Sequence, residues 1–149
     1  MLAYRMPRNP STPRITVWRK LRRLGAVQVL DGLVALPADA RTIEAFEWLA
    51  DEVVEAGGEA SVWSARPTSA GQERRLEIRM AEAAAEEYRT VIAAAQAAAA
   101  EDPSARRRSL LRLRREVARI SGRDHFPPAE RDRAHRAVER LAALVDVEV

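Results

Sequence analysis

Residues 26–37 read AVQVLDGLVALP, which is two short apolar runs separated by Asp31-Gly32. Both runs are rich in valine and leucine, and an Asp-Gly pair between such runs is a strong hairpin signal. The stretch therefore predicts two antiparallel strands, and the elements on either side of this hairpin decide the fold.

Upstream of the hairpin the chain predicts a strand and then a helix. LAYRMP, residues 2–7, is a short apolar stretch that Pro7 stops. The following helix has Ser11 or Thr12 as its N-cap, proline at its first position and Gly25 as its C-terminal stop.

Downstream of the hairpin the same order returns. A helix begins near Asp39 and ends at Gly57-Gly58, and EASVWSA, residues 59–65, predicts a strand. Strand, helix, strand, strand, helix, strand is the order of a ferredoxin-like βαββαβ unit. We therefore predict an α+β fold with a ferredoxin-like core over residues 1–66.

The second half of the chain predicts helices alone. A turn-rich joint, RPTSAGQ at 66–72, leads into a helix over about 73–100 and a second helix over 104–121, and Pro127-Pro128 opens a third. We expect these C-terminal helices, within residues 73–149, to pack on the core or to form a dimer interface.

An apolar seam on the 104–121 helix favours the dimer. Leu110, Leu113, Val117 and Ile120 follow the spacing of a helix face that packs on a partner helix. We predict a homodimer with Leu110, Leu113, Val117 or Trp48 near its interface.

Composition excludes several classes of protein. The chain has 149 residues, of which 47% are hydrophobic, and it has no cysteine, so disulfides and thiolate metal sites are excluded. No apolar run approaches the roughly 20 residues of a membrane span, and we expect a cytoplasmic protein with no membrane partner. His125 and His135 have no recognised metal spacing and are weak metal candidates. No catalytic motif or cofactor motif is present. We therefore expect no bound cofactor, and we favour a protein that is not an enzyme over one that is.

Basic side chains follow one face of two predicted helices. In RITVWRKLRRLG, residues 14–25, the helical repeat separates a buried stripe (Val17, Trp18, Leu21 and Leu24) from a basic face, which consists of Arg19, Lys20, Arg22 and Arg23. A second stripe on the 104–121 helix consists of Arg108, Arg112, Arg115 and Arg119. We predict that these eight residues contact the phosphates of duplex DNA. Such stripes also fit pairing with an acidic helix of the same chain or plain solvation.

That acidic helix lies between the hairpin and the last strand. Its expected buried face consists of Ile43, Phe46, Leu49, Ala50 and Val53. Trp48 falls outside this face, among glutamates, where it either anchors an interface or packs beneath the C-terminal helices.

Three stretches together resemble the N-terminal domain of ChrB-type chromate-resistance proteins. They are YRMPRNPSTPRITVWRKLRRLGAVQVLDGLVALP, EWLADEVVEAGGEASVW and SGRDHFPPAERDRAHRAVERLAAL. The resemblance implies a cytoplasmic transcriptional regulator of chromate resistance that binds duplex operator DNA and responds to an oxyanion effector such as chromate. The second, C-terminal domain that such proteins commonly carry has no counterpart in these residues.

The predicted core also resembles the ferredoxin-like domain of CRISPR spacer-acquisition proteins. Metal-dependent nucleases of that group have an aspartate at the end of the first strand. Here the strand ends in Tyr4-Arg5-Met6-Pro7, so nuclease activity is not expected. The alternative to a regulator is a small ligand-binding or cofactor-binding protein, or an enzyme, on a dimeric ferredoxin-like scaffold that uses His125.

Overall fold

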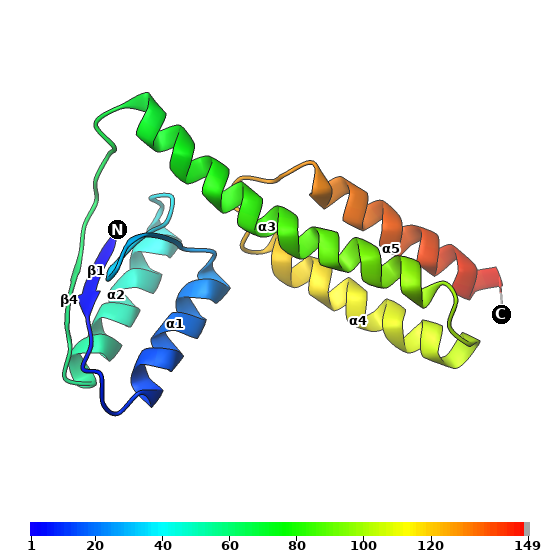
Figure 1. Ribbon diagram of the computed structural model, residues 1–149, viewed down its shortest axis with the longest axis horizontal. Coiled ribbons are helices and arrows are strands. Elements are labelled where there is room, and N and C mark those ends of the chain that lie inside the picture. The colour runs from blue at the N-terminus through cyan, green and yellow to red at the C-terminus, as the bar shows by residue number, and fades with distance from the viewer. Residues whose placement is uncertain (148–149) are drawn as a thin grey trace. The chain divides into compact units, whose positions relative to one another are not determined.

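The computed structural model describes residues 1–147, so the last two residues of the predicted helical region lie outside it. The chain divides into two compact units, Met1–Met80 and Ala81–Val149, here called unit 1 and unit 2. The division falls inside a long helix, α3 (Ala70–Ala98), which begins within the predicted joint at 66–72, three residues earlier than expected. Unit 1 holds the four strands and two helices of the N-terminal half, and unit 2 holds most of α3 and two further helices (Figure 1).

The four strands of unit 1 form one antiparallel sheet, which confirms the α+β prediction. The strands are β1 (Leu2–Arg5), β2 (Val27–Leu30), β3 (Leu33–Ala35) and β4 (Glu59–Val62), and their order in the sheet is β2-β3-β1-β4. β1 ends at Arg5, two residues earlier than LAYRMP suggested.

The hairpin turn between β2 and β3 falls at Asp31-Gly32, as predicted. Gly32 has a φ of 73°, a left-handed conformation that glycine adopts without strain. A Cβ at this position would also lie 2.4 Å from the carbonyl oxygen of Tyr4. Gly32 therefore lets the hairpin approach β1 closely.

Two helices of unit 1 share one apolar core with the sheet. α1 (Thr12–Leu24) and α2 (Ala40–Glu55) contact each other, and α2 also contacts β1 and β4. At the start of α2 the Asp39 carboxylate accepts a 2.8 Å hydrogen bond from the backbone N–H of Thr42. This hydrogen bond is the largest of the causes that lower the pKa of Asp39. The buried core of the unit consists of Leu2, Val17, Leu21, Val34, Phe46, Leu49 and Val53.

Two side chains predicted to be buried in unit 1 are exposed. Trp18 is 51% exposed and Ile43 is 39% exposed. Both lie at the margin of their helix's apolar stripe, where the small sheet leaves nothing to cover them, while Thr42 is buried instead. The prediction of a buried Trp18 was wrong.

One strand at the edge of the sheet carries an additional contact. β2 is an outer strand, and the guanidinium of Arg79 donates a hydrogen bond to the carbonyl oxygen of Gln28 on it. Arg79 lies in the first part of α3, which belongs to unit 1.

Unit 2 is a bundle in which α4 (Pro103–Ser121) and α5 (Glu130–Val147) pack with α3. Its core combines all three helices, with Tyr88, Val91 and Ala95 from α3. The rest of the core includes Leu110, Leu113, Val117, Ile120, Ala134, Val138, Leu141 and Val145. The seam of α4 is therefore filled by its own chain, and Leu110, Leu113 and Val117 are not free to form a dimer interface.

α4 ends where the sequence predicts and begins one residue earlier, at Pro103. Asp102 caps it by accepting hydrogen bonds from the backbone N–H groups of Ser104 and Ala105, and Gly122 follows its last residue. Over the residues that the structure describes, no helix has both the length and the apolarity that crossing a membrane requires.

Candidate nucleic-acid interface

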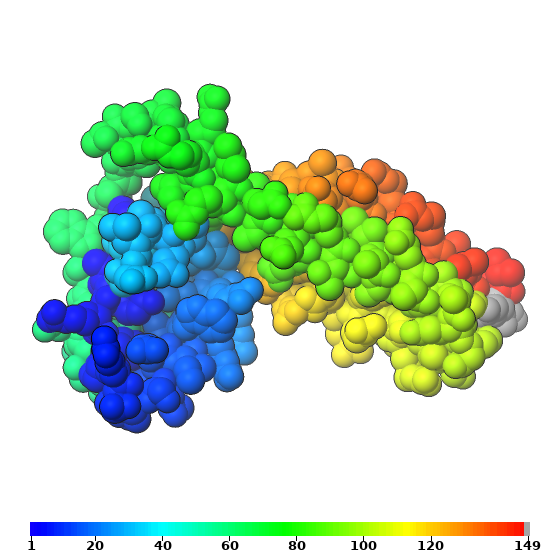
Figure 2. Space-filling model, viewed as in Figure 1, coloured from blue at the N-terminus to red at the C-terminus, as the bar shows by residue number. Residues whose placement is uncertain are grey.

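The first candidate surface lies on α1. This helix carries Arg14, Arg19, Lys20, Arg22 and Arg23 and no acidic residue. All but Lys20 are exposed, and Figure 2 shows the surface of α1 in blue. The ammonium group of Lys20 instead bonds to the carboxylate of Glu52 on α2. The face therefore loses one of its predicted phosphate contacts to an ion pair within unit 1.

An aromatic ring accompanies the arginines of α1. The guanidinium carbon of Arg22 lies 5.0 Å from the ring centroid of Trp18, which is within the range of a cation–π contact. The contact holds two exposed side chains of one helix against each other. It explains how Trp18 can stand outside the core.

The neighbour of α1 carries the opposite charge. α2 bears Glu44, Glu47, Asp51, Glu52 and Glu55 against Arg41. All of these glutamates and the aspartate are exposed except Glu52, which is partly covered and pairs with Lys20. Duplex DNA that approached α1 would therefore also meet a negative helix, and the repulsion would oppose binding.

The second candidate surface lies on α4, which carries few acidic residues of its own. α4 has seven arginines, and its one acidic residue is Glu116. The four predicted arginines, Arg108, Arg112, Arg115 and Arg119, are all exposed. They lie opposite the buried seam, and the surface of α4 is yellow in Figure 2.

Some of the arginines of α4 have other partners. Arg119 pairs with Glu116, and the Nε of Arg115 donates a 3.3 Å hydrogen bond to the carbonyl oxygen of Leu111. Arg106 donates to the carbonyl oxygens of Ala99 and Glu101, and so satisfies acceptors at the end of α3. Within residues 1–147, Arg108 and Arg112 have no ion pair, and their guanidinium groups are available to an external anion.

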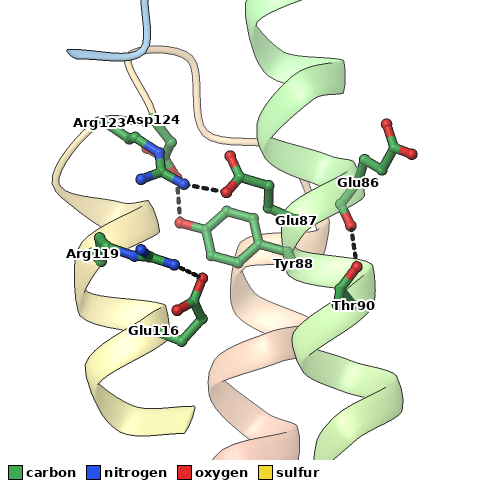
Figure 3. Close-up of polar contacts among 8 residues, drawn as sticks. All are labelled: Glu86, Glu87, Tyr88, Thr90, Glu116, Arg119, Arg123 and Asp124. Carbon is green, nitrogen blue, oxygen red and sulfur yellow. Dashed lines mark hydrogen bonds and ion pairs between the residues drawn. The ribbon is translucent and has the colours of Figure 1, made fainter. Parts of the chain in front are cut away.

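A buried polar cluster at the C-terminal end of α4 was missed by the sequence reasoning. The hydroxyl of Tyr88 donates a 2.5 Å hydrogen bond to the Oδ2 of Asp124 (Figure 3). The same hydroxyl lies 3.1 Å from the hydroxyl of Ser121. The side chain of Asp124 is fully buried, and its Oδ1 lies 3.5 Å from Arg131. The signal available in the sequence was Asp124 directly after the helix stop at Gly122, but its partner is 36 residues away.

The cluster orders the chain after α4, and its tyrosine hydroxyl does not act as an acid or base at neutral pH. Burial and the hydrogen bond to Asp124 raise the pKa of Tyr88 to about 12. Its hydroxyl therefore stays protonated and keeps its bond to the carboxylate. Beside it the guanidinium of Arg123 pairs with Glu87 of α3, and Figure 3 shows this pair next to the Tyr88 ring.

The two histidines are not brought into a metal site. His125 is partly buried next to Asp124, and His135 is exposed on α5. In the described part of the chain, no group of three or more histidine, cysteine, aspartate or glutamate side chains could hold a metal ion.

Comparison with known proteins gives one match. Residues 14–104 match the family model described as "Protein ChrB, N-terminal". The match begins inside α1, includes α2 and all of α3, and ends at the start of α4. No curated protein and no solved structure matches the chain.

Proposed function

This chain belongs to the ChrB N-terminal family of chromate-resistance proteins, and on that premise we propose that it is a DNA-binding transcriptional regulator linked to chromate resistance. The proposal includes contacts to the phosphates of duplex DNA, a cytoplasmic site of action and an oxyanion effector such as chromate. The family supports the link to chromate resistance, and the arginines of α4 support the DNA contact.

The arginine stripe of α4 is the observation that carries the proposal. Arg108, Arg112, Arg115 and Arg119 are exposed on one face, and the helix has only Glu116 to offset seven arginines. From Arg108 to Arg119 the stripe extends about 16 Å at the usual helical rise. This length corresponds to roughly five base pairs along one strand of a duplex.

Phosphate contact is the binding mode that this stripe favours. Guanidinium groups bind phosphate oxygens in two-pronged geometry, and these contacts position a protein on DNA without reading its sequence. A stripe that an acidic neighbour already neutralised would release fewer counterions. For that reason we place the main phosphate contacts on α4, and the predicted contacts of Arg19, Arg22 and Arg23 on α1 stay a prediction.

The scaffold in this proposal is ferredoxin-like. The order β2-β3-β1-β4, with α1 after β1 and α2 after β3, is compatible with a split βαβ arrangement. In this assignment unit 1 is the ferredoxin-like part, and the helices of unit 2 present the DNA-contacting stripe.

A salt series on duplex DNA tests the proposal. If α4 neutralises phosphates, log K falls linearly with log salt, with a slope of about −0.9 per contact. The triple variant Arg108→Ala/Arg112→Ala/Arg115→Ala should flatten this slope by about 2–3 units and bind about 100-fold to 1000-fold more weakly at 0.1 M salt.

A matched control uses the next helix. Arg133→Ala/Arg136→Ala/Arg140→Ala removes the same number of exposed arginines from α5. It should change the slope by less than about one unit. The proposal fails if the wild type does not bind duplex DNA, or if the α4 variant keeps the wild-type slope.

A further inference from the structure

We propose that α1 and α2 together form a self-complementary face, through which two copies of this chain make a two-fold symmetric dimer. The basic surface of α1 in one copy lies on the acidic surface of α2 in the other, and the reverse contact occurs across the axis. The inference goes beyond the proposed function and does not depend on DNA binding.

The charges of the two helices carry the inference. α1 has five basic residues and no acidic residue, and α2 has five acidic residues and one basic residue. The helices are neighbours that pack on the same core (Figure 1). Within one copy, the ammonium group of Lys20 on α1 pairs with the carboxylate of Glu52 on α2.

The remaining charges point away from the core. On α1, Arg19 and Arg23 are exposed, whereas Val17 and Leu21 are buried on the opposite side of the helix. On α2, Glu44 and Asp51 are exposed and lie opposite the buried stripe of Phe46, Leu49 and Val53, at the same helical repeat. The outer surface of this helix pair is thus positive along one helix and negative along the other.

Such a two-sided surface is complementary to itself. In a two-fold interface the same patch occurs on both copies. If the axis runs between α1 and α2, then α1 of one copy contacts α2 of the other. An axis between α1 and α2 sets each positive helix on a negative helix twice. An axis that set each helix on its own copy would instead bring like charges together.

Exposed apolar side chains on the two helices provide apolar surface that a dimer would bury, in addition to the charges. Trp48 on α2 is 67% exposed, Val54 on α2 is 56% exposed and Ile15 on α1 is 45% exposed. Tryptophan is enriched at the energetic centres of protein interfaces. Trp48 stands among the carboxylates of α2, where a second copy would cover it.

The size of the helix pair predicts a weak, salt-sensitive dimer. α1 has 13 residues and α2 has 16, so the layer is about 20 Å long. A layer two helices wide is at the low end of the range for specific interfaces, below about 1,200 Å² in total. We expect a dissociation constant in the micromolar range, and we expect this constant to rise by about tenfold as salt is raised from 50 to 500 mM.

A charge-swap experiment on the full chain without DNA tests the face. The basic-face variant is Arg19→Glu/Arg23→Glu, and the acidic-face variant is Glu44→Lys/Asp51→Lys. Sedimentation equilibrium should show a wild-type dimer, and each variant alone should dissociate at least about 100-fold more readily because like charges then meet. A mixture of the two variants, and the chain that carries all four changes, should dimerise again.

Control variants separate the face from net charge. Arg66→Glu/Arg74→Glu and Asp132→Lys/Glu139→Lys change the same number of exposed charges outside the face, and each should stay as dimeric as the wild type. A monomeric wild type, unaffected face variants, or a mixture that does not re-associate would overturn the inference. So would a monomeric wild type whose basic-face variant loses DNA affinity, which would assign α1 to phosphate.

Discussion

α1 and α4 are both basic amphipathic helices, yet they stand in different electrostatic surroundings. Lys20 of α1 pairs with Glu52 of α2, and α2 carries further exposed carboxylates next to it. α4 has seven arginines and one acidic residue, and Arg108 and Arg112 of its stripe have no ion pair in the described residues. The comparison teaches that a basic stripe becomes a candidate for an external anion only when its tertiary neighbours leave it unneutralised.

The apolar sides of the two helices also differ, and this gives the largest expected effect. Leu113 of α4 is 3% exposed, and Trp18 of α1 is 51% exposed. Leu113→Ala should lower the free energy of unfolding by about 2–5 kcal/mol because it leaves a cavity. Trp18→Ala should lower it by less than about 1 kcal/mol because it removes mainly the contact with Arg22.

Urea denaturation with two probes measures this difference. The chain's three tryptophans, Trp18, Trp48 and Trp63, all lie in unit 1, so fluorescence reports on that unit, and far-ultraviolet circular dichroism reports on both. The Leu113→Ala shift should appear by dichroism. A loss of several kcal/mol in Trp18→Ala would show that this side chain is buried in solution.

The ends of the two helices are held in different ways. Gly25 follows α1, whereas the buried pair of Tyr88 and Asp124 orders the chain after α4. Tyr88→Phe should lower the free energy of unfolding by about 1–3 kcal/mol because the buried carboxylate loses its donor. Ser121→Ala is the milder control, since the donor to Asp124 remains.

The same pair predicts a dependence of stability on alkaline pH. The pKa of Tyr88 is raised to about 12 in the folded state from 10.0, so the folded protein holds this proton more tightly than the unfolded chain does. The stabilisation is complete below pH 10 and is lost as the pH rises from 10 to 12. The pH series of unfolding free energy should be flatter in Tyr88→Phe, and equal slopes in the two proteins would refute the assignment.

Chemical modification of arginine compares the two basic surfaces directly. Near 90% saturation with duplex DNA, the modification rate of Arg108 and Arg112 should fall about tenfold, because the rate follows the free fraction of the protein. Arg19 and Arg23 should be protected much less, because the carboxylates of α2 next to them oppose the approach of DNA. Peptide mass spectrometry measures both sets in one sample, and protection of α1 alone would reverse the comparison.

The smallest effect is expected for the ion pair that distinguishes α1. The side chains of Lys20 and Glu52 are 41% and 38% exposed, so solvent screens their interaction. Lys20→Met should change the free energy of unfolding by less than about 1 kcal/mol, as followed by tryptophan fluorescence. A double-mutant cycle with Glu52→Gln isolates the pair, and a coupling of several kcal/mol would contradict a screened contact.

Local signals in the sequence were sufficient for the elements and their order. The Asp31-Gly32 hairpin, the break before α4 and the apolar repeats of α4 and α5 depend on residues a few positions apart. Each acts through backbone geometry or helical periodicity, which a single sequence contains. The α+β class followed from them.

Interactions between distant residues were not accessible in the same way. Lys20 and Glu52 are 32 residues apart, and Tyr88 and Asp124 are 36 residues apart. The arginines of both candidate surfaces were found from their type and spacing, but whether a carboxylate faces them depends on tertiary packing. The exposure of Trp18 was missed for the same reason, because a residue at the edge of an apolar stripe is covered only if a neighbour reaches it.

The contact between Arg79 and the carbonyl oxygen of Gln28 has a consequence for misassembly. An outer strand such as β2 offers its backbone to any extended chain that arrives, and sheet-to-sheet aggregation begins in this way. A foreign strand that added to β2 would have to displace a charged donor from Gln28 and then accommodate its positive charge. Arg79 thus acts as a gatekeeper at this edge, through a bond that ties the first part of α3 to the sheet.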